Sequence, residues 1–516
     1  MALVNLTHLR AAAAALCVAL AGPVLADVST EAQALHVLNR LSYGPAPGDV
    51  ERVQRIGIER YIDEQLHPER LPLPGALTQR LDGLESTRLS QRELALRFRD
   101  AARAAKDDGE NGKAMRRELV QRVALEAGEA RLHRAIHSPR QLQEVMVDFW
   151  FNHFNIFIGK GPVRVMVENY EREAIRPHAM GRFRDLLGAT ARHPAMLVYL
   201  DNWLSAAPGY KPRRNAGSLG QATGLNENYA RELMELHTLG VDGGYTQRDV
   251  TELARMFTGW TLNPRARGAS LFHFDPRRHD PGDKEWLGRR VAARGQAEGE
   301  WALDVLASHP STARRVGHKL AQYFVADEPP PALVDRLARR FRDTDGDIRA
   351  VLKTLFDSAE FRDPKAQAAK FKTPYRYLVS SVRAAQLPVS NVRPLLATLY
   401  LLGMPLYGCQ TPDGYKNTEA AWLNPDALTR RINFATAFAS GKLPFARPTD
   451  DGDMVAAGKA ADLKFNPAWA TAPVDAGALL ATLGGSISQR TRAEVVQAEP
   501  LLRAALLLGS PDFMRH

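Results

Sequence analysis

The sequence predicts a mainly α-helical protein, multi-helical and globular, with a small β insertion near residues 262–295. Apolar residues recur at three- and four-residue spacing over most of the 516 positions, which is the period of a helix. This period is lost between Leu262 and Gly295, where residues 270–274 have the composition of a short strand. No repeat of fixed period is visible, which argues against a solenoid.

In the N-terminal part, helices are predicted at residues 31–41, 50–66, 84–105 and 115–136. Residues 106–113 are rich in Asp, Gly, Asn and Lys and are predicted to form an exposed loop. Ser138 is predicted to cap the next helix, with Pro139 in its first turn and Gln141 at the reciprocal capping position. This helix continues through Trp150 and His153.

In the C-terminal part, residues 206–224 are rich in Gly, Pro, Ser and basic side chains and are a candidate mobile loop. The strand at 270–274 is expected to pair near Trp286 and Val291. Helices are predicted within 302–361, at 374–385 and at 392–401, and final helices near 492–498 and 500–508. The domain prediction is a helical core at 27–445 and, at 446–516, an Ala/Gly-rich loop with closing helices.

Residues 1–26 have the pattern of a secretory signal peptide. Arg10 precedes a short apolar run at residues 11–22, and small residues precede a cleavage site after Ala26. A single arginine favours the general secretory route over the twin-arginine route. The run is too short to span a bilayer, and no other segment is apolar enough to do so. We therefore expect a soluble protein that is periplasmic or secreted.

Charge and cysteine content exclude some classes of protein. The formal charge of +10 is spread along the chain, so it slightly favours anionic polymers of the cell envelope and predicts no nucleic-acid partner. Of the two cysteines, Cys17 lies in the signal peptide. Cys409 alone cannot form an intrachain disulfide, and it is expected to be a small buried hydrophobic residue.

The segment 226–240 is the strongest candidate for a functional site. If it is one helix, a polar stripe carries Glu227, Asn228, Arg231, Glu232 and Glu235. The opposite, apolar side carries Tyr229, Leu233, Leu236 and His237. Glu232 and Glu235 are neighbours at this spacing, and adjacent carboxylates raise one another's proton affinity, which suits acid–base catalysis or a divalent cation. The alternative is a solvated face with ion pairs, such as Arg231 with Glu227 or Glu235.

Two histidines and one aspartate are further catalytic candidates. His153 lies in the aromatic run 149–154, and Asp201 lies in the polar run 199–202. His237 is either a core histidine or faces His153. The candidate metal ligands are Glu232, Glu235, His153 and His237, which would form a mixed histidine–carboxylate site. Their spacing matches no standard zinc motif.

The candidate substrate-binding residues are Asn228, Arg231, Trp260, His279 and Lys284. Arg231 would orient the carboxylates or bind an anionic group, and Trp260 would stack on a sugar ring. The alternatives are core packing for Trp260 and an aspartate-capped loop for residues 279–284. Residues 343–347 superficially resemble a calcium loop, but Thr354 stands where Glu is required, so Asp347 is expected to be a helix cap. The sequence contains no nucleophile elbow, phosphate loop or dinucleotide fingerprint.

Several ordered stretches resemble one bacterial family. They are residues 38–45, 149–154, 170–173, 175–176, 193–197, 199–202, 226–240, 256–260, 279–280 with Lys284, and 309–310 with 312–313. Over nearly the whole mature length the chain resembles the family catalogued as domain of unknown function 1800. The resemblance implies an exported, largely helical protein, often encoded beside a second exported family that looks sulfatase-like. It implies no activity and no catalytic residues.

These observations lead to three functional hypotheses. The first is an envelope or extracellular hydrolase of a carbohydrate-type polymer, with Glu232 and Glu235 as acid–base pair or cation ligands and His153 and Asp201 completing the site. One carboxylate of such a pair must hold its proton near neutral pH. The second is a non-catalytic accessory protein that binds a surface polymer or an exported, sulfatase-like partner. The third is a metal-dependent oxidase or peroxidase that uses the histidines.

Overall fold

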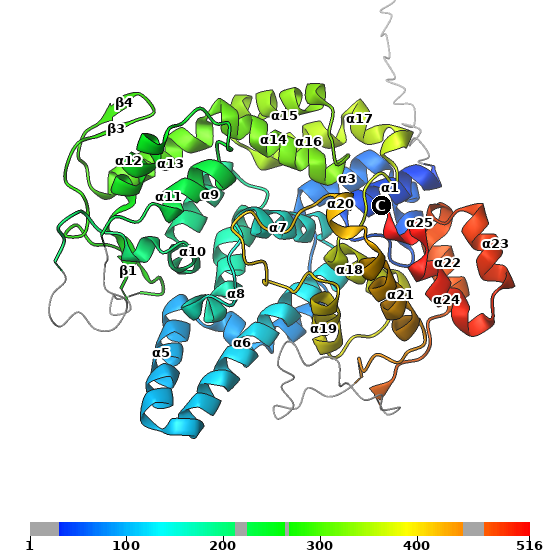
Figure 1. Ribbon diagram of the computed structural model, residues 1–516. Coiled ribbons are helices and arrows are strands. Elements are labelled where there is room, and N and C mark those ends of the chain that lie inside the picture. The colour runs from blue at the N-terminus through cyan, green and yellow to red at the C-terminus, as the bar shows by residue number, and fades with distance from the viewer. Residues whose placement is uncertain (1–29, 212–223, 264–267, 447–468) are drawn as a thin grey trace, which may run out of the picture.

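The computed structural model describes residues 30–211, 224–263, 268–446 and 469–516 (Figure 1). The predicted fold class is confirmed, because the protein is mainly α-helical and its described strands form only two antiparallel two-stranded sheets. The predicted signal peptide, most of the candidate mobile loop and much of the Ala/Gly-rich tail lie outside the described residues. Within the described residues, none of the helices combines the length and the apolarity that a membrane crossing requires.

In the described part of the chain, the four strands lie between residues 260 and 291, and the elements before and after them are helices. The first half contains α1 (Glu31–Leu41), α2 (Asp49–Ile56), α3 (Ile58–Leu66), α4 (Gly75–Asp82), α5 (Gln91–Asp107), α6 (Gly109–His137), α7 (Gln141–His153), α8 (Val167–Asn169), α9 (Phe183–Arg192), α10 (Pro194–Tyr199), α11 (Asn228–Glu232) and α12 (Gln247–Phe257). The strands are β1 (Trp260–Leu262), β2 (Phe272–Phe274), β3 (Lys284–Trp286) and β4 (Arg289–Val291). The second half contains α13 (Gln296–Ser308), α14 (Pro310–Phe324), α15 (Pro331–Asp343), α16 (Ile348–Phe356), α17 (Ala359–Arg362), α18 (Pro374–Ala385), α19 (Arg393–Leu401), α20 (Glu419–Trp422), α21 (Pro425–Ala439), α22 (Ala476–Leu483), α23 (Gln489–Gln497), α24 (Pro500–Gly509) and α25 (Pro511–Met514).

Three predicted helix boundaries are corrected by the structure. Residues 50–66 form two helices, because Gly57 adopts a positive φ of 84° and ends α2. The loop predicted at 106–113 is only a tight turn at Asp108, and α6 begins at Gly109. Helix α7 begins at Gln141, and Ser138 instead accepts a hydrogen bond from the Arg140 N–H at 3.1 Å.

The strand pairing also differs from the prediction. The strand predicted at 270–274 exists as β2, but it pairs with β1, in the register Trp260 with Phe274. The segment near Trp286 and Val291 pairs with itself, as the hairpin β3–β4. Its two-residue loop, Leu287 and Gly288, has positive φ at both positions, which is the geometry of a tight hairpin turn.

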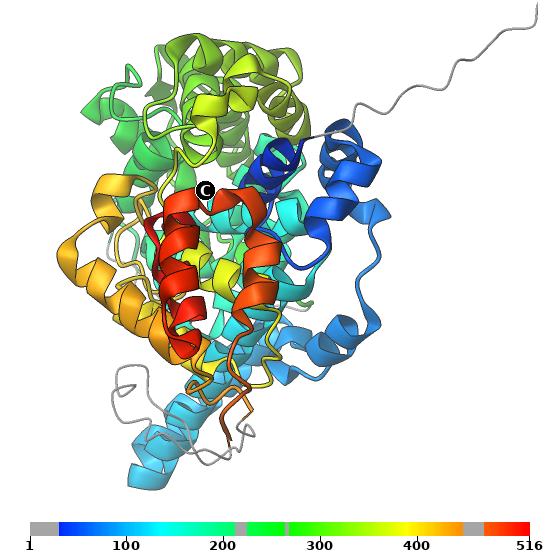
Figure 2. The ribbon, with the colours of Figure 1, turned by 90° about the vertical axis from the view of Figure 1, so that its right-hand side faces the viewer.

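One large apolar core unites the chain from α1 to α25. Helices α14, α15 and α16 form a layer along one side, and the α5–α6 hairpin projects from the opposite side (Figure 1). The C-terminal helices lie beside α1 in both views (Figures 1 and 2). Glu31 of α1 accepts a hydrogen bond from the Gly485 N–H at 2.5 Å, so the two ends of the described chain are joined.

Two smaller predictions are confirmed. Cys409 is buried and is the free cysteine of the described chain. Asp347 caps α16 by accepting a hydrogen bond from the Ala350 N–H at 3.0 Å.

Candidate functional site

The polar segment at 226–240 is helical, but it changes type part-way along. It begins as α11 and continues as a π-helix at Leu233–His237. The Thr238 hydroxyl donates to the Leu233 carbonyl at 2.6 Å, and the Gly240 N–H donates to the Met234 carbonyl at 3.1 Å. These bonds close the wider turn. Single π-helical turns frequently mark functional sites.

The predicted polar and apolar sides of this segment are largely confirmed. Tyr229, Leu233 and His237 are buried, and Leu236 lines a cavity. Arg231 pairs with Glu227 at 3.1 Å, as the four-residue spacing predicts. It also donates to the Gln247 amide oxygen at 2.9 Å.

The two glutamates of the segment differ in their surroundings. Burial raises the pKa of Glu232 above its ordinary value, and the charges of Glu235 and Asp413 raise it further. Arg231 opposes this shift. The surroundings of Glu232 therefore favour its protonated form more than the ordinary value would.

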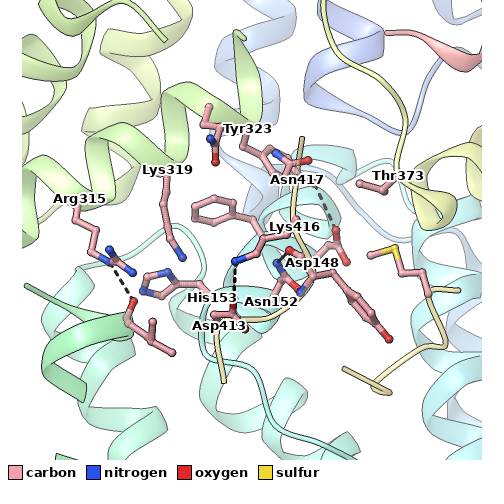
Figure 3. A pocket seen from close by; sticks show the side chains of 15 residues that line it. Asp148, Asn152, His153, Arg315, Lys319, Tyr323, Thr373, Asp413, Lys416 and Asn417 are labelled. Atoms are coloured by element: carbon pink, nitrogen blue, oxygen red, sulfur yellow. Dashed lines mark hydrogen bonds and ion pairs between the residues drawn. The ribbon is translucent and has the colours of Figure 1, made fainter. Parts of the chain in front are cut away.

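A cavity of about 230 Å³ adjoins this segment (Figure 3). It lies between α7, the last turn of the π-helix at Leu236, α14 and the loop at residues 403–418. Its polar lining includes Asn152, His153, Arg315, Lys319, Asp413 and Lys416. Of these, only His153 was a predicted site residue.

The loop at 403–418 is fastened to α7 by side-chain amides. Asn152 accepts from the Tyr415 N–H at 2.7 Å and donates to the Tyr415 carbonyl at 2.8 Å. Asn155 donates to the carbonyls of Cys409 and Thr411 at 3.0 and 2.8 Å. Gly414 has a φ of 73°, and a Cβ there would lie 2.2 Å from the Asn152 carbonyl oxygen. Only glycine allows this close approach.

Asp413, at the tip of this loop, is held in its ionised form. It accepts hydrogen bonds from Lys416 and Thr411, both at 2.6 Å. Burial by itself would raise the pKa of Asp413, but these hydrogen bonds and the Lys416 charge bring that pKa below its ordinary value. The pKa values of Glu232 and Asp413 are thus shifted in opposite directions.

The opposite wall of the cavity is basic. Lys319 and Arg315 project from α14 toward His153 (Figure 3). Burial and then the Arg315 charge lower the pKa of Lys319 to about 7. The Arg315 Nε donates to the Leu236 carbonyl at 3.1 Å, which ties α14 to the π-helix.

His153 and His237 are neighbours, as one of the two predicted alternatives required. Their ring centroids are 6.2 Å apart, and His153 Nε2 donates to the His237 carbonyl at 3.0 Å. His153 Nδ1 is therefore an acceptor, and it is buried without a partner among the described residues. Burial and then the Lys319 charge lower the pKa of both histidines, that of His237 to about 3. Both rings are neutral at physiological pH.

The other predicted site residues lie outside this cavity. Asp201 pairs with Lys160 at 2.7 Å, and Asn228 donates to the Leu200 carbonyl at 3.4 Å. Trp260 is fully buried and packs edge-on against Phe257, so neither face is open to a sugar ring.

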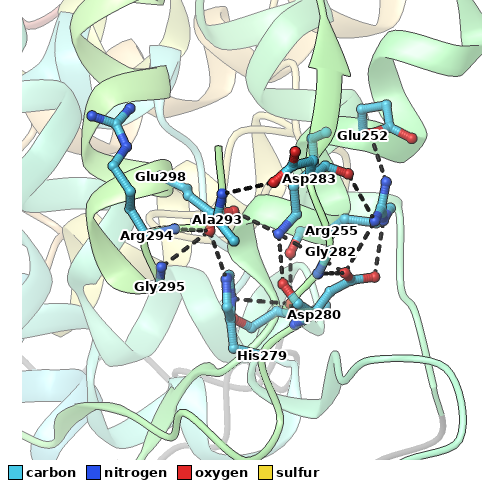
Figure 4. A network of polar contacts seen from close by, with 12 residues as sticks. Glu252, Arg255, His279, Asp280, Gly282, Asp283, Ala293, Arg294, Gly295 and Glu298 are labelled. Carbon is cyan, nitrogen blue, oxygen red and sulfur yellow. Dashed lines mark hydrogen bonds and ion pairs between the residues drawn. The ribbon is translucent and has the colours of Figure 1, made fainter. Parts of the chain in front are cut away.

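His279 and Lys284 belong to a separate buried network around Glu298 (Figure 4). Lys284 Nζ lies 2.7 Å from Glu298 Oε2, and His279 Nε2 lies 3.2 Å from Glu298 Oε1. Burial alone would raise the pKa of Glu298, but the hydrogen bonds from His279 and Lys284 lower it. This network fastens the β3–β4 hairpin to α13, because Glu298 lies in the first turn of that helix.

The predicted metal ligands do not converge. Over the described ranges, no group of three or more His, Cys, Asp and Glu side chains is placed to hold a metal ion. His153 and His237 contact each other, whereas the pKa of Glu232 is raised by the charges of Glu235 and Asp413.

Comparison with known proteins identifies the family. The model of the family described as protein of unknown function DUF1800 matches residues 36–515. The chain belongs to this family. Neither the curated proteins nor the solved structures provide a match.

Proposed function

We propose that this protein is an exported hydrolase of a carbohydrate-type polymer, with Glu232 as general acid and Asp413 as the ionised carboxylate. The observation that supports it is the opposite shift of two neighbouring carboxyl pKa values, upward for Glu232 and downward for Asp413. Such divergence separates the acid from the base in carboxylate enzymes. The export part of the proposal rests on the N-terminal sequence pattern, with cleavage after Ala26.

In this mechanism, the Glu232 carboxyl group donates its proton to the glycosidic oxygen as the bond to the anomeric carbon breaks. Asp413 either removes a proton from the attacking water or attacks the anomeric carbon itself. Glu235 acts through Glu232, because its negative charge keeps the proton on Glu232. Glu235 is thus a positioning residue.

The test is turnover of acidic and neutral polysaccharides by the mature protein and by three variants. Glu232→Gln should lose roughly 100-fold or more in kcat, the usual contribution of a general acid. Glu235→Gln should stay active, but the alkaline limb of its pH–rate profile should move to lower pH. Glu227→Gln is the matched control, since Glu227 lies on the same segment and binds Thr251 and Gln247 instead.

An unchanged rate for Glu232→Gln would refute the proposal. Equal loss of folding and turnover in Glu232→Gln would make this segment structural. No turnover of any polymer, together with an exported protein that co-purifies, would favour the accessory-protein hypothesis.

A further inference from the structure

The cavity contains two cationic side chains that lack a carboxylate partner. Among the residues that the structure describes, no hydrogen bond or ion pair reaches the Lys319 amine. Within the described ranges, the Arg315 guanidinium donates to the Leu236 carbonyl, and the charge of Glu235 acts on it without forming an ion pair. Both side chains are mostly buried, and both line the same space.

The carboxylates that line the cavity are already engaged by other groups. Asp148 pairs with Arg131 at 2.5 Å and accepts a hydrogen bond from the Tyr323 hydroxyl at 3.4 Å. Asp413 is bound by Lys416 and Thr411. The cavity therefore has excess positive charge on its α14 side.

An uncompensated buried charge is unfavourable for folding. Removing an ion from water costs several kcal/mol unless a partner of opposite charge lies close by. The lowered pKa of Lys319 reflects this, because burial and the neighbouring Arg315 both disfavour its charged form. A bound anion would supply the missing countercharge.

We propose that this cavity binds one oxyanion group, a carboxylate or a sulfate ester, between Lys319 and Arg315. A guanidinium presents paired N–H donors that match the oxygens of such a group, and the lysine adds a compact charge. The volume of about 230 Å³ is below the roughly 300–1,000 Å³ of pockets for drug-sized ligands. It suits one small substituent rather than an oligomer.

The same site identifies a substrate class for the hydrolase. Asp413, the ionised carboxylate of the proposed mechanism, lines the cavity, so an anionic substituent held there lies beside that carboxylate. The polymer would then be an acidic polysaccharide. This last step rests on the proposed function, whereas the anion site does not.

The affinity should depend on pH through Lys319. The groups that face it are Arg315 on α14, Lys416 and Asp413 on the loop, and His153 and His237, which are neutral. Lys319 is charged below about pH 7 and loses its proton above it. Anion binding should therefore be tighter at pH 6 than at pH 9.

The experiment is calorimetric titration of the mature protein with sodium sulfate, with glucuronate and with neutral glucose, in chloride buffer of constant ionic strength. Lys319→Met should weaken binding of at least one anion by tenfold or more. Lys372→Met is the matched control, since it also removes a buried lysine of lowered pKa, one that lies over the Phe513 ring. It should bind the anions as the wild type does.

Stronger binding of sulfate indicates a sulfate ester, and stronger binding of glucuronate indicates a uronate. Equal binding of glucose and glucuronate, or anion binding that is unchanged in both Lys319→Met and Arg315→Met, would overturn the anion site. Glu232→Gln separates the two proposals, because it should bind anions normally but should turn over a polymer at a rate lower by roughly 100-fold or more. Anion binding without turnover by the wild type would retain the site and refute the hydrolase.

Discussion

Two buried lysines in this chain have opposite surroundings. Lys284 is fully buried and lies 2.7 Å from the Glu298 carboxylate, within a network that His279 completes (Figure 4). Lys319 has no such partner among the described residues, and it faces Arg315 and a cavity (Figure 3). The first lysine is placed as a structural cross-link, and the second is placed as a binding group.

The difference shows why burial alone does not identify a functional residue. A buried charge that is paired and hydrogen-bonded is accounted for by the fold. A buried charge without a partner destabilises the free protein, and such a residue is commonly retained for function at the expense of stability. The following experiments test this distinction.

The largest effect on the free energy of unfolding is expected for Lys284→Met. This change leaves the Glu298 carboxylate buried without its cation, which should lower the free energy of unfolding by about 3–5 kcal/mol. Urea unfolding followed by circular dichroism measures it. The double variant Lys284→Met/Glu298→Gln should recover part of the loss, because it no longer contains the unpaired Glu298 carboxylate. A loss below about 1 kcal/mol would contradict the role assigned to this ion pair.

The sequence predicts a functional role for the wrong one of these two lysines. The sequence singles out Lys284 because it belongs to the polar turn 279–284, whereas Lys319 lies in an ordinary amphipathic helix that predicts no site. Whether a lysine meets a carboxylate depends on segments distant in the chain, and a single sequence does not contain that information. A four-residue spacing to Arg315 was the one local sign that two cations share a helix face.

Local patterns predicted the helices well and the contacts between segments poorly. The helices α1 and α18 were predicted at their observed boundaries, because periodicity and capping are local properties. The partner of β2 was predicted incorrectly, because pairing of strands is not local. The neighbouring carboxylates Glu232 and Glu235 followed from spacing, but Asp413 did not, although an Asp-Gly pair marks a turn there.

The second largest effect concerns the loop that closes the cavity. Gly414→Ala must place a methyl group 2.2 Å from the Asn152 carbonyl oxygen, at a positive φ. Strain of this kind and the left-handed backbone together should cost about 2–4 kcal/mol. Gly403→Ala is the matched control, since it has a φ of 80° and open space around its Cβ position. It should cost only about 1–2 kcal/mol. If Gly414→Ala and Gly403→Ala lose equal stability in thermal unfolding, the backbone at Asn152 moves aside and the close contact is not costly.

Lys319→Met should change the free energy of unfolding in the opposite direction. Replacing an unpaired buried cation by an apolar side chain of similar length should raise the free energy of unfolding by about 1–2 kcal/mol at pH 7 in anion-free buffer. Thermal unfolding at low ionic strength measures the gain. A loss of stability would show that the Lys319 amine makes a favourable interaction in the free protein, and the comparison with Lys284 would fail.

The smallest expected effect is the pH dependence of the stability that Lys319→Met gains. The native pKa of Lys319 is about 7, below the ordinary 10.5, so between these values the unfolded chain binds a proton that the native chain lacks. Stability from this group therefore rises with pH from about 7 to 10.5, and it is lowest below pH 7. The advantage of Lys319→Met over wild type should shrink as pH rises, by at most about 1.4 kcal/mol per pH unit. Taking the difference between the two proteins cancels the other titrating groups, including Lys372. An advantage that stays constant from pH 6 to 10 would show that Lys319 titrates normally, and that the cavity does not disfavour its charge.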